Sequence, residues 1–264
     1  MNRKNRILLL ELTKTDFKLR YQGSVLGYLW AIIRPLLMFG ILYLVFAKFL
    51  RFGDEIPHYP VYLLVGTVLW NFFTECTNQG IQSLIIRSDL MRKIAFPRFV
   101  IVLSATMTAL INLGINLIVI VVFALLSGVE ISLSWLIVPF LILELYILSL
   151  GIALFLGSLN VKFRDVGSIW EVLIQALFYA VPIIYPLGMV LNYSDVAAKI
   201  LMLNPIAQVI QDTRYNLITK ETLTGWGILD NPFMKLIPLV FVLVIFLVGY
   251  YVFKKKSKYF AEEI

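Results

Sequence analysis

Long apolar runs alternate with short polar segments along this chain. A helix that crosses a bilayer needs about 20 mostly apolar residues, and the pattern predicts an all-α membrane protein with six transmembrane helices. With residues 254–264 as a cytoplasmic tail, the whole chain, 1–264, is expected to form one transmembrane domain. The predicted spans are residues 29–50, 59–80, 99–127, 135–159 and 169–190, which make spans one to five over 29–190, and residues 236–253.

The second predicted span is the least apolar, because polar side chains crowd its second half. Such groups are costly in hydrocarbon, so we expect this half to face protein or water instead of lipid. The polar residues are Asn71, Thr74, Glu75, Thr77, Asn78 and Gln79.

Three glutamates, Glu75, Glu144 and Glu171, fall inside predicted spans. An ionised carboxylate at that depth is costly and points to function by default, and a proton-coupled carrier would use such groups as a relay. The interpretation that we favour is structural: each glutamate is paired with Arg34, bonded to a neighbouring helix, or solvated near an interface.

Basic residues fall mostly on one side of the predicted spans. They gather in the N-terminal segment, in the connections after the second and fourth spans, and in the tail. Because lysine and arginine are enriched in cytoplasmic loops, we expect a multi-pass protein with both termini in the cytoplasm. The first apolar run stops at Glu11 and is too short for a cleaved signal peptide.

Residues 1–28 are predicted to be a cytoplasmic interface helix with its connection to the first span. Between residues 7 and 21 the apolar side chains fall in two stripes on a helical wheel, with charges between them. A helix with two apolar stripes can contact two different surfaces, which favours a position between lipid and another protein. An extension of the first span is the alternative. The stripes are Leu8, Leu12 and Leu19, and Leu10, Phe17 and Tyr21.

Residues 191–235 form a longer connection than two neighbouring spans need. Ser194 is a suitable N-cap for a helix over 195–203, and Asn204-Pro205 is suited to start a second helix that ends at residue 218. Each helix is too short to cross a bilayer. We therefore expect two outer gate helices that lie on the outer face or partly re-enter it.

The connection between the second and third spans is a short mixture of charged and apolar residues with helical character. It lies on the expected cytoplasmic side and is tied to a span at each end, so it is a candidate docking element, with Leu90 and Met91 as apolar anchors. An ordinary solvated, basic loop is the alternative. The candidate docking residues are Arg87, Ser88, Asp89, Leu90, Met91, Arg92 and Lys93.

Composition excludes several classes of function. Hydrophobic residues make up 60% of the chain and charged residues 15%, with a mean hydropathy of +0.88, which is outside the range of soluble enzymes. One cysteine and one histidine exclude an internal disulfide and a Cys/His zinc site, and we expect no metal and no catalytic residue. The net charge of +7 lies at the edges of apolar runs, so nucleic acid is not an expected partner.

No glycine is followed by lysine, so the phosphate-binding Gly-Lys-Ser/Thr motif is absent. If ATP drives transport, a separate subunit must bind ATP and magnesium, and we expect this chain to bind no cofactor. A proton-coupled carrier would need no such partner. A membrane transferase would need clustered carboxylates or histidines, whereas those of this sequence are scattered.

Aromatic residues form 14% of the chain, and many lie in or at the ends of predicted spans. Contact with lipid and the interfacial belt are their commonest roles, and we favour these for most of them. Rings that line a lumen would instead offer sugars an apolar surface without a deep binding well. The candidate channel aromatics are Trp30, Tyr43, Phe178, Tyr179 and Tyr185.

Several motifs together resemble the type-2 ABC exporter permeases for O-antigen, capsule and teichoic acid. Residues 20–30, followed by Pro35, are similar to the start of the first span in that family, and residues 159–166 resemble the Arg-Asp motif before its fifth span. Residues 182–186 look like the end of that span, and residues 203–205 match the start of its second outer helix. The likeness covers nearly the whole chain, and the tail is most similar to the O-antigen branch.

This resemblance implies a homodimer, bound to two copies of an ABC nucleotide-binding subunit, that moves undecaprenyl-diphosphate-linked polysaccharide across the bacterial plasma (inner) membrane. By position, residues 87–93 are the docking element, and Arg34, Arg164 and Asp165 belong to the cytoplasmic mouth. Six helices in one copy are too few to enclose a sugar polymer, so two-fold assembly is also the physical expectation. A teichoic acid or capsule exporter, and a permease for a small molecule or lipid, are the alternatives.

Overall fold

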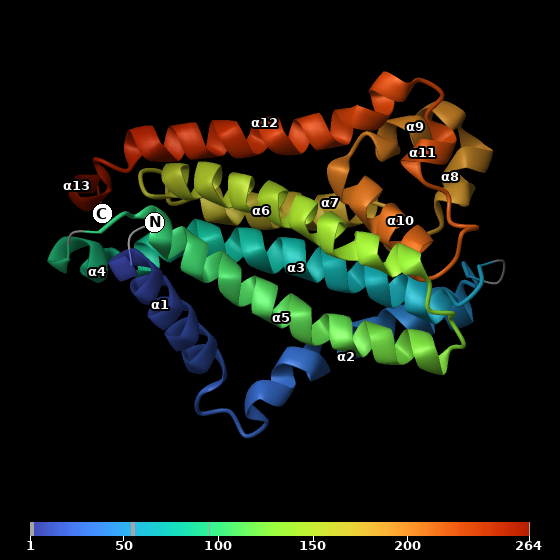
Figure 1. The fold of residues 1–264 in the computed structure, drawn as a ribbon, viewed down its shortest axis with the longest axis horizontal. Helices are drawn as coiled ribbons and strands as arrows, with labels where there is room; N and C mark the ends of the chain where they lie inside the picture. The colour runs from blue at the N-terminus through green and yellow to red at the C-terminus, as the bar shows by residue number, and fades with distance from the viewer. Residues whose placement is uncertain (1–2, 54–55, 95, 264) are drawn as a thin grey trace.

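Long helices run side by side along the whole length of the molecule in this computed structural model (Figure 1). The structure describes residues 3–53, 56–94 and 96–263, which contain helices and connections but no strand. The N- and C-terminal segments lie at one end of the bundle and the short helices α8, α9 and α11 at the other (Figure 1). The all-α prediction is therefore confirmed for the described residues.

Four stretches of the described chain are helices long and apolar enough to cross a membrane, and they correspond to the first, third, fourth and sixth predicted spans. The first, Gly27–Phe49, combines η1 (Gly27–Leu29), α2 (Trp30–Leu42) and the π-helical η2 (Tyr43–Phe49). The others are α5 (Phe99–Leu126), η3 (Leu133–Ile137) continued by α6 (Val138–Asn160), and α12 (Pro232–Lys256).

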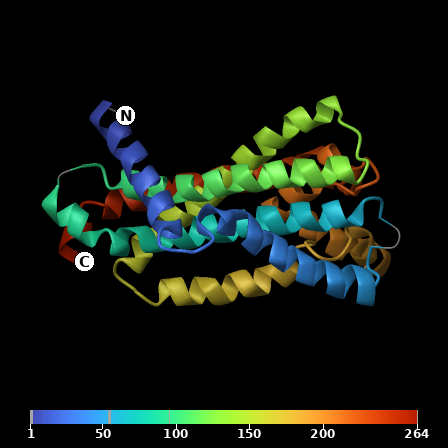
Figure 2. The ribbon, with the colours of Figure 1, turned by 90° about the horizontal axis from the view of Figure 1, so that it is seen from below.

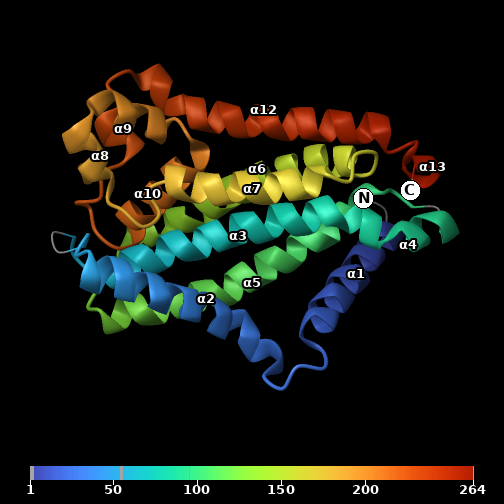
Figure 3. The ribbon, with the colours of Figure 1, turned by 180° about the vertical axis from the view of Figure 1, so that it is seen from behind.

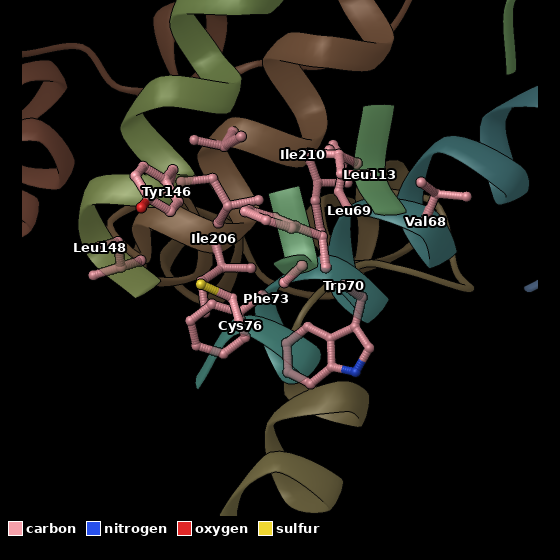
Figure 4. Close-up of a cluster of buried hydrophobic side chains, with 14 of the residues drawn as sticks. Val68, Leu69, Trp70, Phe73, Cys76, Leu113, Tyr146, Leu148, Ile206 and Ile210 are labelled. Carbon is pink, nitrogen blue, oxygen red and sulfur yellow. The ribbon is translucent and has the colours of Figure 1, made fainter. Parts of the chain in front are cut away.

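The second predicted span is part of α3 (Tyr59–Ile86), which has more buried residues than any other described helix. It packs against α5, α6 and α10, and also against α7 (Val166–Ala180). Figure 4 shows Trp70, Phe73 and Cys76 of α3 in the apolar cluster that they form with residues of α5, α6 and α10. Thr77 is buried, whereas the other polar side chains of its second half line a cavity, so this half faces protein and a polar cavity, in agreement with the expectation of protein or water neighbours.

The fifth predicted span, residues 169–190, is wrong as one continuous helix. Helix α7 ends at Ala180, and Val181 is extended with φ −98° and ψ 140°. The cause is Pro182, which lacks an amide hydrogen and disfavours helical geometry in the residue before it. The chain becomes helical again only at α8 (Leu187–Tyr193), after Pro186.

Within residues 191–235, two helices begin where their caps predict. The Ser194 hydroxyl accepts a hydrogen bond from the Ala197 amide at 3.3 Å, and α9 spans Asp195–Met202. The Asn204 side chain accepts from the Ile206 amide at 2.9 Å, and α10 spans Pro205–Leu217. The structure adds α8 and α11 (Gly225–Ile228), which the sequence analysis did not identify.

Helix α12 lies along α6 on one side of the bundle, as Figures 1 and 3 both show. The two helices touch at glycines: a Cβ atom on Gly249 would lie 2.2 Å from the Gly151 carbonyl oxygen. This close crossing needs small residues on both helices, which is a common way to pack helices in lipid. The remaining surface of α12 exposes large apolar side chains, which suits contact with lipid.

The N-terminal helix α1 (Arg3–Tyr21) runs obliquely to the bundle (Figure 2). Leu9 and Leu12 are buried against α5, whereas Leu19, predicted to share the stripe of Leu12, is 62% exposed. The reason is that Asp16 and Arg20 form ion pairs with the bundle, which turns the face between the two predicted stripes inward. The predicted helix is confirmed, but its buried face is not the stripe containing Leu19.

Candidate functional site

A cavity of about 600 Å³ lies between the end of α1 and helices α2, α3 and α5. Its walls combine two arginines, one glutamate, several amides and a tryptophan. Polar groups of this kind are unusual beside a helix as apolar as α2. The polar lining comprises Arg20, Tyr21, Trp30, Arg34, Asn71, Thr74, Glu75, Asn78, Gln79, Asn112 and Asn116.

Glu75 is the centre of a hydrogen-bond network in this cavity. Its carboxylate forms an ion pair with Arg20 of α1 and accepts hydrogen bonds from Gln79 Nε2 at 3.0 Å and Asn112 Nδ2 at 2.6 Å. Asn112 Oδ1 in turn accepts from the Tyr21 hydroxyl at 3.0 Å. The network fixes the end of α1 to α3 and α5, and burial raises the pKa of Tyr21.

The cavity keeps an excess of positive charge, because Glu75 is one anion facing the guanidinium groups of Arg20 and Arg34. Arg34 is exposed in the first span and has no ion-pair partner among the described residues. A cation inside a membrane span is costly without a partner and is stabilised by an anionic ligand. The arrangement is therefore suited to bind phosphate groups next to sugars.

The structure does not bring the three predicted mouth residues together at this cavity. Arg34 lines it, but Arg164 and Asp165 are exposed in the turn between α6 and α7 and do not. Asp165 precedes α7 without a capping hydrogen bond from its side chain.

The predicted docking element folds as α4 (Ser88–Lys93), directly after α3. Arg87 at the corner pairs with Asp16 of α1. Met91 is buried and Leu90 packs against Leu9 and Leu12, so the expected apolar anchors face the chain's own core. The side chains exposed at this corner are Ile86, Asp89, Arg92, Lys93 and Ile94.

The candidate channel aromatics are also spread over different surroundings. Trp30 lines the polar cavity, and Tyr43 stacks on Phe39 with ring centroids 5.8 Å apart. Phe178 packs on Trp70 at 5.8 Å, while Tyr179 is exposed and accepts a hydrogen bond at its carbonyl from the Tyr185 hydroxyl. Within one copy these rings do not line one channel.

The three intramembrane glutamates have different environments. Glu75 is bonded to neighbouring helices, as the structural interpretation expects, but to Arg20 instead of Arg34. Glu144 lines a second cavity, of about 720 Å³, together with Asp212 and Lys235, and Glu171 is exposed. No sequence pattern indicates the pairing of Arg20 with Glu75, because the two residues lie on different helices.

The similarity of this chain to known proteins agrees with these features. A model of the ABC-2 type transporter family matches residues 8–218. The chain belongs to the ABC-2 type transporter family. Within the family, the chain is 32% identical over 257 residues to the O-antigen export system permease protein RfbA of Klebsiella pneumoniae. The aligned region covers 97% of this chain and 94% of that protein.

Two further relatives are less similar. The protein of the same name from Myxococcus xanthus is 31% identical over 216 residues, 81% of this chain and 80% of that protein. The polysialic acid transport protein KpsM of Escherichia coli is 22% identical over 207 residues, 75% of this chain and 76% of its own length. The resemblance read from the motifs is thus confirmed at the level of the ABC-2 family, and the chain is a multi-pass membrane protein.

Proposed function

We propose that this chain is the membrane-spanning subunit of an ATP-driven exporter that moves undecaprenyl-diphosphate-linked polysaccharide of the O-antigen type. The observation that carries the proposal is the cavity of about 600 Å³ with Arg20, Arg34 and amide side chains beside the first span. The relatives named for O-antigen export support this substrate class, at a higher identity than the relative named for polysialic acid transport.

The chemistry of such a substrate matches the lining of the cavity. A diphosphate needs cationic donors, which Arg20 and Arg34 supply, and sugars need amide donors and acceptors with an aromatic face, such as Trp30. The carrier's hydrocarbon tail needs access from the lipid. That access lies beside the first span, because only 11% of the residues in the most apolar stretch of Gly27–Phe49 are buried.

The remaining parts of the exporter follow from this assignment. We assign α3, and α7 with the broken stretch after it, as the two further spans of a six-span subunit with both termini in the cytoplasm of a bacterial inner membrane. Helices α9 and α10 are its outer gate. Two copies form the pathway, and two ABC subunits bind ATP and magnesium, since this chain has no phosphate-binding loop.

The cytoplasmic corner formed by residues 86–94 is the proposed surface for the ABC subunit. Ile86 and Ile94 are exposed apolar side chains beside Arg92 and Lys93, a combination that fits an apolar groove with carboxylates at its rim. Arg164 and Asp165, also exposed, belong to the cytoplasmic mouth of this assembly.

The test is binding and export with a charge-neutral cavity. Arg34→Gln should weaken binding of undecaprenyl diphosphate by about tenfold or more, because one charge-assisted hydrogen bond is worth roughly 1.5–3 kcal/mol. The readouts are tryptophan quenching by that lipid in nanodiscs, and polysaccharide at the surface of cells that also contain the ABC subunit.

Arg6→Gln is the matched control, since Arg6 is an exposed arginine of α1 outside the cavity. It should bind and export like the unaltered chain. Equal binding of undecaprenyl diphosphate and undecaprenol by the unaltered chain would contradict recognition of the diphosphate, and unchanged export by Arg34→Gln would remove the cavity from the pathway.

A further inference from the structure

Arg214 of α10 is a fully buried cation in the outer half of the molecule. It has no carboxylate partner within salt-bridge distance among the described residues. Its guanidinium carbon instead lies 3.5 Å from the centre of the Tyr62 ring, and Gln211 Oε1 accepts a hydrogen bond from Nη1 at 3.0 Å. A charge this deep is costly unless all its donors are used, so the groups around it decide its role.

The other donors of Arg214 hold backbone carbonyls from two separate segments. Nε donates to the Tyr62 carbonyl of α3 at 3.0 Å. Nη1 donates to the Pro182 carbonyl at 2.7 Å, and Nη2 donates to the Ile183 carbonyl at 2.6 Å. Pro182 and Ile183 belong to the non-helical stretch between α7 and α8, whose carbonyls lack helical partners and need others away from water.

Helix α3 is shaped to admit this side chain. A Cβ atom on Gly66 would lie 2.3 Å from Arg214 Nη2, so only glycine leaves room for the guanidinium. About two turns before it, the Tyr59 hydroxyl donates to the Ile184 carbonyl at 2.7 Å. The broken stretch, α10 and α3 therefore meet at the Arg214 guanidinium. Its planar fork supplies the several donors that the surrounding acceptors need, and the ammonium group of a lysine would supply too few.

The opposite end of α3 is the docking corner. The helix runs without a break from Tyr59 to Ile86 and passes through Arg87 into α4. Figure 3 shows α3 extending from the level of α10 to the level of α4. A shift of α4 along the axis of this continuous helix would also move the Tyr62 carbonyl and Gly66, which contact Arg214.

We infer that Arg214 is a positioning residue that fastens the outer helices α8 and α10 to α3, so that movement at α4 is transmitted to the outer gate. The fastening follows from the contacts of Arg214 alone. The transmission rests on the proposed function, since it assumes an ABC subunit at α4.

The experiment uses the full chain in nanodiscs with its ABC subunit and compares Arg214→Met, Arg214→Lys and Gly66→Ala. Gly114→Ala is the matched control, because a Cβ atom at Gly114 of α5 meets nothing within 4 Å. Hydrogen–deuterium exchange of residues 181–193 and 205–217 measures the fastening. ATP hydrolysis and polysaccharide export measure the transmission.

Arg214→Met should raise exchange in 181–193 by about tenfold or more, since it removes several charge-assisted bonds to that stretch. Gly66→Ala should also raise exchange in these residues. Added to Arg214→Met, it should raise exchange little further, because both substitutions disrupt the same contact. Exchange in α4 and the amount of bound ABC subunit should stay unchanged, while export falls although ATP is still hydrolysed.

Unchanged exchange in 181–193 for Arg214→Met would overturn the fastening. Raised exchange with normal export would overturn the transmission. If Arg214→Met does not accumulate in the membrane, Arg214→Lys and Gly66→Ala decide the same question. If the unaltered complex exports no polysaccharide, the proposed function fails, and the exchange data still decide whether Arg214 fastens the outer helices.

Discussion

At the scale of single residues, Asp212 of α10 is a buried carboxylate with few hydrogen bonds to offset its loss of hydration. Its carboxylate is 7% exposed and accepts one side-chain hydrogen bond, from Gln208 Nε2 at 2.6 Å. Burial raises the pKa of Asp212 above its usual value, which means that the folded chain disfavours the charged form. Glu144, Lys220, Glu221 and Lys235 line the same cavity of about 720 Å³.

Replacing Asp212 by asparagine should therefore stabilise the protein at neutral pH. A carboxyl whose folded pKa is raised destabilises the fold once the pH exceeds its unfolded pKa of about 4, and the loss is complete above the folded pKa. The apparent Tm of Asp212→Asn should exceed that of the unaltered chain at pH 7 and equal it near the acid end. Thermal unfolding in detergent from acidic to neutral pH is the measurement.

Asp230→Asn is the matched comparison with the opposite sign. Asp230 is exposed, and its hydrogen bond from Lys199 lowers its pKa. The ionised Asp230 carboxylate contributes to stability above its pKa in the unfolded chain, and this contribution is lost as the pH falls through its pKa in the folded chain. Replacing Asp230 by asparagine should therefore not raise the Tm at pH 7. A lower Tm at pH 7 for Asp212→Asn would contradict the assignment.

At the scale of elements, α4 shows how packing redistributes the roles of neighbouring residues. Met91 lies in the same apolar cluster as Phe253 and Phe260, and α13 (Phe260–Glu263) contacts α4. The Phe253 and Phe260 rings are 5.4 Å apart. The inner side of α4 is therefore part of the bundle, and a partner has access only to its outer side.

Substitutions on the two sides of this corner should separate stability from docking. Ile94→Asp should reduce co-purification of the ABC subunit and leave the Tm unchanged, because Ile94 is 53% exposed. Met91→Ala should lower stability by about 2–5 kcal/mol, as for other buried methionines. Membranes with matched permease levels give the co-purified amount, and thermal unfolding gives the stability.

Ile131→Asp is the control for adding a charge, since Ile131 is 70% exposed in the connection between α5 and η3, away from α4. It should retain the ABC subunit. Full retention with Ile94→Asp would leave α4 as a solvated basic corner and move the docking role to α1.

At the scale of the whole molecule, the two ends of the bundle differ in what they carry. Both terminal segments and α4 lie at one end, and α8, α9 and α11 lie at the other (Figure 1). The single cysteine, Cys76, is fully buried. Cysteines placed at each end will therefore report orientation without a reactive background.

Lys220→Cys should react with a membrane-impermeant maleimide added to intact spheroplasts, because Lys220 lies at the proposed outer end. Lys258→Cys should react only after the membrane is opened, because the tail is proposed to be cytoplasmic. Both measurements are made in a Cys76→Ala background, with that parent as the control. Labelling of Lys258→Cys in intact cells would reverse the orientation that the basic residues predict.

The spans with a strong periodic or continuous apolar signal, and the caps of α9 and α10, could be predicted from the residues alone. These features depend on local chemistry: hydropathy over about 20 residues, and hydrogen bonds between an N-cap side chain and the next turn. The ABC-2 family was also readable from motifs such as residues 20–30. Pro182 carried the information that span five breaks, but the apolar residues around it favoured a continuous helix.

Tertiary structure alone decided which polar groups meet. Glu75 and Arg20, or Arg214 and the carbonyls of Pro182 and Ile183, lie far apart in sequence and contact one another only because helices pack side by side. The same packing turned Met91 inward and Leu19 outward. Buried ions need partners wherever they can be reached, so their positions follow from the arrangement of the whole bundle and not from the residues next to them in the chain.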